Sequence, residues 1–321
     1  MKIAILNECF FTPNQIKQLE AIGQLQIYTD TTTEKQAKER LQDVSIAVVD
    51  GFISPLTKNV LENTNKLQLI CLMSTGFDSI VDYDTANKKD IKVANVPEFA
   101  TDAVAEYAIG LMFAVMRKIP QEDKLMRIKP FELDPGDKTQ RKFLGNVMRG
   151  KTIGIIGLGN IGLRVAEIAH GLGMHVLGFN RTQKNVSFVK QVGLEQLLKE
   201  SDVISLHLAL SKETEHILSA REFQLMKPGS IVINTARGKH IDTQSLIDSL
   251  QSGKLAGAGL DVLEDWSIEN PLLKLDTVVL TPHSAFFTKE SLHNLASIIV
   301  KNIEAFANGK PINIVNNQYE S

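Results

Sequence analysis

Short runs of aliphatic and β-branched residues alternate with amphipathic segments along the first hundred residues. The apolar runs predict strands at residues 2–6, 26–29, 45–49, 67–72 and 91–96. Between them, helical periodicity predicts helices at residues 13–22, 34–41 and 56–62. Strands that alternate with helices form parallel sheets, so this part of the chain is predicted to be an α/β domain.

A second alternating series begins near residue 150. Strands are predicted at residues 152–156, 175–179, 203–208, 230–234, 258–262 and 277–280, and helices at residues 161–172, 194–199, 220–226 and 243–251. The fold class is therefore α/β, with two doubly wound parallel sheets in tandem.

Three further segments lie outside the two alternating series. A helix over residues 103–117, which Asp102 can cap, has an apolar middle and is expected to join the two domains. Residues 120–150 are charged and rich in turn formers, and predict a helix remnant and a surface loop. After a last helix over residues 289–307, the tail near Val315 can return to the first domain.

Composition narrows the range of partners. A length of 321 residues suits about two domains, and 35 basic against 37 acidic residues leave a net charge of −2. We therefore expect a small-molecule partner, and neither nucleic acid nor a membrane surface. The longest apolar run, residues 107–116, has half of the ~20 residues that a membrane-spanning helix needs, so no membrane span is expected. The two cysteines, Cys9 and Cys71, lie in apolar runs, which favours a cytoplasmic protein without a disulfide framework.

A glycine-rich turn joins a predicted strand to a predicted helix. Its sequence is Gly157, Leu158, Gly159, Asn160, Ile161 and Gly162. In a G-x-G-x-x-G turn, the first glycine permits the tight turn, the second lets a pyrophosphate approach, and the third lets the helix pack closely. Strand, turn and helix together predict a dinucleotide site, against the alternative of a glycine turn that binds nothing.

The end of the next strand bears on which dinucleotide binds. An acid there would accept hydrogen bonds from the ribose of NAD, but the chain has Asn180, followed by Arg181 and Thr182. Arginine and hydroxyl groups, with Lys184 nearby, can donate to a 2′-phosphate, so we favour NADP slightly over NAD. Alternatively, Arg181 stacks on the adenine or points into water.

Two residues at predicted strand ends suit carbonyl chemistry. The planar guanidinium of Arg237 can bind a carboxylate and a keto oxygen together, and the imidazole of His283 can supply a proton. An arginine or a histidine of this kind would, taken alone, more often have a structural role. Because both follow strands of the sheet that carries the predicted dinucleotide turn, together they predict a catalytic site. His207 is a candidate neighbour of the cofactor. The other histidines show no ligand spacing, so no metal is expected.

These motifs, with residues 234–238, 259–262 and 281–283, resemble the D-isomer-specific 2-hydroxyacid dehydrogenase family. Further landmarks that resemble the family lie at residues 74–78, 95–97, 104–106 and at Arg117. The resemblance implies a flavodoxin-like substrate domain, residues 1–98 and 286–321, with a Rossmann-type cofactor domain, residues 99–285, inserted into it. It also implies a homodimer.

The resemblance further implies roles for single residues. The backbone amides around Ser74, Thr75 and Gly76 would hold the substrate carboxylate. Asp261 would lie near the nicotinamide, and Thr235 and Ala236 would also contact the cofactor.

One departure from the family concerns the acid that pairs with the catalytic histidine. The family has a glutamate where this chain has Trp266. Glu264, Asp265 and Glu269 remain candidates, of which we favour Glu264. A further alternative is that none of these three acids pairs with His283. A carboxylate beside His283 would raise the pKa of the imidazole and help it to donate a proton.

The predicted function is an NAD(P)-dependent oxidoreductase that interconverts a small 2-keto acid and a D-2-hydroxy acid. Residues 285–288 resemble the lactate-type branch, whereas residues 180–182 resemble NADP-using glyoxylate and hydroxypyruvate reductases. Two alternatives remain. One is a formate- or phosphite-type dehydrogenase. The other is a cofactor-sensing dimeric protein of corepressor type, and turnover of a 2-keto acid far above background would exclude this second alternative.

Overall fold

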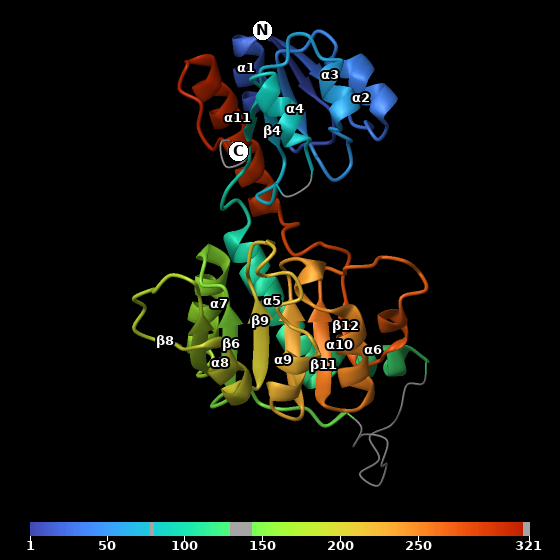
Figure 1. The fold of residues 1–321 in the computed structure, drawn as a ribbon, viewed down its shortest axis with the longest axis vertical. Coiled ribbons are helices and arrows are strands. Elements are labelled where there is room, and N and C mark those ends of the chain that lie inside the picture. The colour runs from blue at the N-terminus through green and yellow to red at the C-terminus, as the bar shows by residue number, and fades with distance from the viewer. Residues whose placement is uncertain (78–79, 129–142, 317–321) are drawn as a thin grey trace. The chain divides into compact units, whose positions relative to one another are not determined.

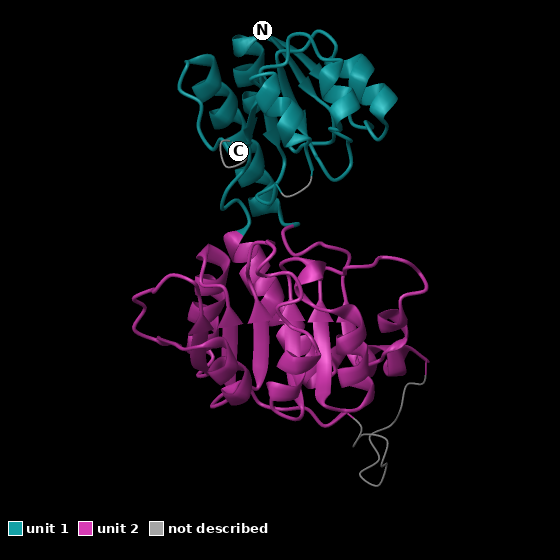
Figure 2. Cartoon of the chain, viewed as in Figure 1, with its two compact units in different colours: residues 1–100, 287–321 teal, residues 101–286 magenta. Residues whose placement is uncertain are grey.

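A computed structural model describes residues 1–77, 80–128 and 143–316 of the chain. The chain forms two compact units, one from Met1–Ala100 with Phe287–Ser321 and one from Thr101–Phe286 (Figure 2). The boundaries expected from the sequence, after residue 98 and before residue 286, lie within two residues of these limits.

The first unit is built on a five-stranded parallel sheet. Its strands, in the order β2-β1-β3-β4-β5, are β1 (Lys2–Ile5), β2 (Gln24–Ile27), β3 (Ile46–Val49), β4 (Leu69–Leu72) and β5 (Lys92–Ala94). The strand order is that of flavodoxin-like domains. Its helices are α1 (Pro13–Ile22), α2 (Glu34–Leu41), α3 (Lys58–Glu62), α4 (Tyr83–Lys88) and α11 (Lys289–Ala307) (Figure 1).

Alternating side chains of these strands cover the two faces of the sheet. Ala47 and Val49 of β3 pack in a core with buried residues of α2, α3 and α4. Helix α11 packs against α1, and Gln15 Nε2 donates to Ser297 Oγ at 3.0 Å. Beyond α11, Ile314 forms an antiparallel bridge with Ala94 at the edge strand β5. The predicted return of the tail to the first domain is therefore confirmed.

The second unit contains a seven-stranded parallel sheet in the order β12-β11-β10-β9-β6-β7-β8. Its strands are β6 (Thr152–Ile156), β7 (His175–Phe179), β8 (Val189–Gln191), β9 (Val203–Leu206), β10 (Ser230–Asn234), β11 (Leu255–Leu260) and β12 (Val278–Leu280). Its α-helices are α5 (Thr101–Arg117), α6 (Ile119–Ile128), α7 (Asn160–Gly171), α8 (Leu194–Glu200), α9 (Ala220–Leu225) and α10 (Thr243–Gln251).

Successive residues of the central strands enter separate cores on the two faces of this sheet. In β10, Ile231 and Ile233 pack in the core that includes α5 and α7 residues, whereas Val232 packs in the core that includes residues of α8, α9 and α10. In the described part of the chain every strand pairing of this sheet is parallel, so the carboxyl ends of the strands meet at one edge. In such sheets this edge is the place where ligands bind.

The structure adds elements that the pattern did not predict. Helix α4 has six residues and strand β8 three, too short for a clear periodicity. Within the segment expected to be a helix remnant and loop, α6 is a helix of ten residues, and residues 129–142 lie outside the described part. Among the described residues, no helix has the length and apolarity needed to cross a membrane.

Candidate active site

The glycine turn lies between β6 and α7, as the sequence predicts. Gly157 has φ +99°, and a Cβ there would lie 2.4 Å from the carbonyl oxygen of His207. At Gly162 a Cβ would lie 1.9 Å from the carbonyl oxygen of Gly157. Only glycine therefore lets the turn pass the end of β9 and lets α7 pack against it.

Space for a ligand remains at the start of α7. Gly159 is the N-cap, and a Cβ built on it would have no described heavy atom within 4 Å. Asn160 and Ile161 then begin the helix, whose free N–H groups favour a phosphate.

A second observation concerns Thr235, just after β10. Its buried Oγ1 has no hydrogen-bond partner among the described residues, although buried hydroxyls normally have one. The turn and this unpaired hydroxyl fit a bound dinucleotide.

The loop after β7 is closed by two side-chain amides. Asn180 Oδ1 accepts from the Leu158 N–H at 3.0 Å, and Asn180 Nδ2 donates to the Thr182 carbonyl at 2.8 Å. Gln191 Nε2 donates to the carbonyls of Asn180 and Thr182, both at 3.2 Å. Gln191 Oε1 accepts from the Lys184 N–H at 2.9 Å. Sequence reasoning missed Gln191, because its role depends on a contact across the loop.

These amides fix the backbone while leaving three candidate side chains in the solvent. Arg181, Thr182 and Lys184 are all exposed. The positive charge of Arg181 also helps to lower the pKa of Glu213, after the hydrogen bond from Ser211. The loop therefore presents donors, two of them cationic, rather than the acid that NAD-binding turns carry.

His207 follows β9 directly. Its Nε2 lies 2.8 Å from Ser205 Oγ. Burial lowers the pKa of His207 from 6.5 to about 3, because a charged imidazole would lose its hydration. The residue is therefore neutral at physiological pH and adds no charge to the predicted cofactor site.

The turn after β10 holds Arg237. Asn234, fully buried, accepts from the Ala236 N–H at 2.9 Å and donates to the Arg237 carbonyl at 2.8 Å. The Arg237 guanidinium is half-buried and donates to the Ala236 carbonyl at 2.8 Å. A Cβ at Gly238 would lie 2.1 Å from the Leu263 carbonyl carbon, so this turn packs directly on the loop after β11.

Asp261, the first residue after β11, builds the turn that carries His283. Its buried carboxylate accepts from Thr281 Oγ1 at 2.6 Å and from the N–H groups of Ser284 and Ala285, both at 2.9 Å. The His283 N–H donates to the Asp261 carbonyl at 2.9 Å. His283 has φ +55°, a left-handed conformation that costs energy outside glycine, so these bonds stabilise it.

Asp261 also joins the two catalytic candidates. Its N–H donates to the Asn234 carbonyl at 2.9 Å, and Asn234 holds the Arg237 turn. Arg237 and His283 thus follow β10 and β12, which flank β11 at one edge of the sheet. Because β11 lies between β10 and β12, the backbones of these two strands are about 10 Å apart. Side chains as long as those of arginine and histidine can reach a common substrate across this distance.

The carboxylate of Glu264 has other partners than the predicted histidine. Its Oε1 lies 3.0 Å from His216 Nε2, and its Oε2 accepts from Thr243 Oγ1 at 3.1 Å. Asp265 accepts from the Ser267 N–H and hydroxyl, which lower the pKa of its carboxyl. Glu269 is exposed. The pairing of one of these acids with His283 stays a prediction.

The predicted substrate loop lies in the first unit, directly after β4. All three of its carbonyls are bound: that of Ser74 by the Val96 N–H, that of Thr75 by Asn95 Nδ2 and that of Gly76 by the Ser74 hydroxyl. The N–H groups of these three loop residues have no acceptor among the described residues. Backbone N–H groups left free in a turn are suited to bind an anion.

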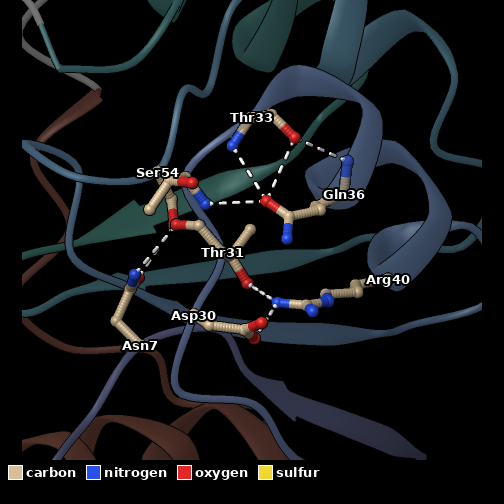
Figure 3. A network of polar contacts seen from close by, with 8 residues as sticks. Asn7, Asp30, Thr31, Thr33, Gln36, Arg40 and Ser54 are labelled. Atoms are coloured by element: carbon tan, nitrogen blue, oxygen red, sulfur yellow. Dashed lines mark hydrogen bonds and ion pairs between the residues drawn. The ribbon is translucent and has the colours of Figure 1, made fainter.

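Neighbouring loops at the same edge of this sheet are tied together by side chains (Figure 3). Asn7, after β1, donates to the Thr31 carbonyl after β2 and accepts from the Asp50 N–H after β3. Arg40 binds Asp30 at 2.8 Å, and Ser54 lies within hydrogen-bond distance of Asn7 and Thr31. The edge is therefore ordered beside the substrate loop.

No group of three metal-binding side chains occurs within the described ranges 1–77, 80–128 and 143–316. The two cysteines, Cys9 and Cys71, are free thiols, and burial raises the pKa of both.

Comparison with known proteins gives a consistent family. Residues 109–285 match the D-isomer specific 2-hydroxyacid dehydrogenase, NAD binding domain. A glyoxylate reductase of Thermococcus litoralis is 39% identical over 94% of this chain and 93% of its own. A hydroxypyruvate reductase of Blautia hydrogenotrophica is 35% identical over 98% of this chain and all of its own length.

A solved structure extends the match to the fold. An acyclic imino acid reductase, in complex with NADPH and D-Arg, has 36% sequence identity and a TM-score of 0.88, covering 98% of this chain and 100% of that one. Both parallel-sheet domains are thus found in a related oxidoreductase. The chain belongs to the D-isomer-specific 2-hydroxyacid dehydrogenase family.

Proposed function

We propose that this enzyme uses a nicotinamide cofactor to reduce a small 2-keto acid to the D-2-hydroxy acid, with Arg237 and His283 as catalytic residues. One observation carries the assignment of the residues. Through Asn234 and Asp261, the turns that bear Arg237 and His283 are bonded to each other at the ligand-binding edge of the sheet that also carries the glycine turn. The names of the similar proteins, glyoxylate and hydroxypyruvate reductase, support the substrate class.

Each catalytic residue has a chemical task that fits its side chain. The Arg237 guanidinium orients the substrate through carboxylate and keto oxygen, and stabilises the negative charge that develops on the keto oxygen. His283 donates a proton to that oxygen, and accepts it back in the oxidative direction. A bound nicotinamide supplies or accepts the hydride.

The substrate carboxylate has a second binding site in this proposal. The free N–H groups of Ser74, Thr75 and Gly76 bind it, because their carbonyls are already bonded within the first unit. Glu264 remains our candidate for the acid that raises the pKa of His283. For that role its carboxylate must leave His216 and Thr243.

NADPH is the proposed cofactor. Asn180 removes the negative charge that would repel a 2′-phosphate, and the exposed Arg181, Thr182 and Lys184 can donate to it. With NADPH, reduction is the expected direction. Asp261, Thr235, Ala236 and His207 lie on the strand ends that would face the nicotinamide half.

The test is the loss of reduced-nicotinamide absorbance with NADPH and NADH and a panel of glyoxylate, hydroxypyruvate, pyruvate and branched 2-keto acids. We expect turnover far above background with at least one acid, and a lower KM for NADPH. A lower KM for NADH would reject the cofactor assignment. Turnover only when an amine is added with the keto acid would indicate imine reduction instead.

Two other outcomes would favour the alternatives. Oxidation of formate or phosphite, without reduction of any keto acid, would indicate a dehydrogenase of that type. Tight NADPH binding with no turnover of either class would indicate a cofactor-sensing protein. The free thiols Cys9 and Cys71 support a cytoplasmic location for the enzyme.

A homodimer is also proposed. Helix α6 has no buried residue, and its apolar side chains Ile119, Met126 and Ile128 are exposed. Leu144 and Val147, further along the chain, are exposed as well. A contiguous apolar surface usually binds a partner chain, and in this proposal the five side chains form such a surface. Light scattering after gel filtration should give twice the chain mass, and Ile128→Glu with Leu144→Glu should give the monomer. A monomeric wild-type protein would reject the dimer.

A further inference from the structure

The substrate loop is held from behind by Asn95. Asn95 Nδ2 donates to the Thr75 carbonyl at 2.7 Å, and Thr75 Oγ1 donates to the Val96 carbonyl at 2.7 Å. The Val96 N–H donates to the Ser74 carbonyl at 2.9 Å. The residues just after β5 therefore bind the loop at three points, and each bond uses a group that does not belong to the proposed carboxylate site.

Asn95 is itself fixed by the last part of the chain. The Asn302 side chain, from α11, donates to the Asn95 carbonyl at 2.9 Å. The Asn95 N–H donates to the Asn313 carbonyl at 3.1 Å. Asn313 Nδ2 in turn donates to Asn302 Oδ1 at 2.8 Å. A closed set of three asparagines thus joins α11, the tail and β5.

Burial shows how much this arrangement depends on its hydrogen bonds. Asn95 is 7% exposed and Asn302 only 1%. Burying a side-chain amide costs free energy unless the amide is hydrogen-bonded, whereas an apolar residue could fill the same space without that cost. The two amides are therefore explained by the hydrogen bonds that they make. Asn313 also has φ +56°, a conformation that asparagine adopts more readily than most residues.

We propose that Asn95, Asn302 and Asn313 are positioning residues for substrate binding. By binding the Thr75 carbonyl, Asn95 fixes the orientation of the following peptide group, whose N–H belongs to Gly76. Because that peptide is planar, holding its carbonyl oxygen also aims its N–H. Asn302 and Asn313 hold Asn95, so α11 and the tail set the affinity for the 2-keto acid carboxylate without touching it. This inference rests on the proposed role of the loop at residues 74–76.

The experiment compares steady-state kinetics of variants in the full-length protein. Asn95→Ala should raise the KM for the 2-keto acid about tenfold, with kcat changed less than threefold, because a bond that aims one donor is lost. The Ki of oxamate, a carboxylate analogue of the substrate, should rise in parallel. The Kd for NADPH measured without keto acid should stay within twofold, since the glycine turn lies in the other unit.

Asn302→Leu is the second variant, in case Asn95→Ala does not fold. Leucine has nearly the shape of asparagine, so this change removes the bond to the Asn95 carbonyl and the bond from Asn313 Nδ2 with little change in packing. We expect a smaller rise in the KM for the keto acid, about threefold, again without loss of NADPH binding.

Asn316→Ala is the matched control. Asn316 is a tail asparagine that is 3% exposed and binds Ile91, Val93 and Asn87, with no bond to the substrate loop. Its loss should lower Tm to a similar extent but leave the KM for the keto acid unchanged. An equal rise in KM for this control, or an unchanged KM for Asn95→Ala, would overturn the inference.

Gly76→Pro separates this inference from the proposed function, because proline removes the N–H itself. A raised KM for Gly76→Pro with an unchanged KM for Asn95→Ala would reject only the positioning role. If neither variant changed the KM of an active enzyme, the carboxylate site itself would be wrong.

Discussion

Asp261 shows how one buried side chain can organise two turns at the end of a sheet. The family resemblance implied that it lies near the nicotinamide, and its neighbours in the structure reveal a further task. Its carboxylate binds three groups of the turn that carries His283, and its backbone joins that turn to β10. The free energy of these bonds offsets the cost of the positive φ at His283.

Replacing Asp261 with Asn should therefore damage both stability and catalysis. An amide NH₂ would face backbone N–H donors, leaving at least one buried donor unpaired at a cost of about 2 kcal/mol. We expect the free energy of unfolding in urea to fall by about that amount and kcat to fall at least tenfold. Asp248→Asn, on the exposed side of α10, is the control and should leave both unchanged. Wild-type kcat for Asp261→Asn would show that His283 needs no such support.

The pH dependence of stability should report on His207. Its pKa is about 3 in the folded protein against 6.5 ordinarily, so the unfolded chain binds more protons in between. The free energy of unfolding contributed by this residue therefore decreases as pH falls from about 6.5 towards 3. In urea titrations, His207→Gln should lose about 2–3 kcal/mol less than wild type between pH 6.5 and 4. Parallel curves for the two proteins would contradict a buried neutral imidazole.

The positions of Arg237 and His283 after strands could be predicted from the sequence, and their catalytic roles stay predictions. Arg237 and His283 stand at strand ends, where ligands bind in open α/β sheets. Gln191, Asn95 and Asn302 could not be found this way. Gln191 binds backbone groups 7 to 11 residues away, Asn95 a carbonyl 20 residues away and Asn302 a carbonyl 207 residues away. Nothing in the local pattern separates these amides from surface ones.

Among the elements, the unit of β6, turn and α7 is the most strictly determined by sequence. Gly157 and Gly162 meet backbone atoms where any side chain would clash. This is why a six-residue motif could predict strand, turn and helix in register. By contrast α4, with six residues, and β8, with no buried residue, carry too few apolar positions for a periodicity to show.

Gly162→Ala should disturb the phosphate turn. A methyl group 1.9 Å from the Gly157 oxygen forces α7 away from the turn, so we expect at least a tenfold rise in the Kd for NADPH and a loss of about 2 kcal/mol or more in stability. Gly171→Ala, at the end of the same helix with open space around it, is the matched control and should be neutral or slightly stabilising. Fluorescence titration with NADPH distinguishes the two.

For the molecule as a whole, the chain order matters as much as the local sequence. The tail completes the first unit by pairing with β5, and Val315 is buried there. Alternating strands and helices predicted both sheets, but the tail's pairing partner depends on a fold that brings residues 93–95 and 313–316 together.

Truncation after Lys310 should therefore weaken only one unit. It leaves the Val93 N–H and carbonyl without the partners that Asn316 and Val315 provide. Hydrogen exchange should show faster exchange in β4 and β5, with unchanged protection in β6, β9 and β10. Uniform loss of protection across both sheets would mean that the two units unfold as one.

The continuous course of the second unit has a consequence for protein engineering. Residues 101–286 form one uninterrupted insertion, and Tyr107 near its start contacts Ser284 near its end at 3.1 Å. The insertion thus fastens its own two ends. A single stretch of gene that encodes residues 101–286 can therefore be exchanged between homologous enzymes, and we expect such chimaeras to inherit nucleotide preference from the donor, because the glycine turn and residues 180–184 lie within the exchanged stretch.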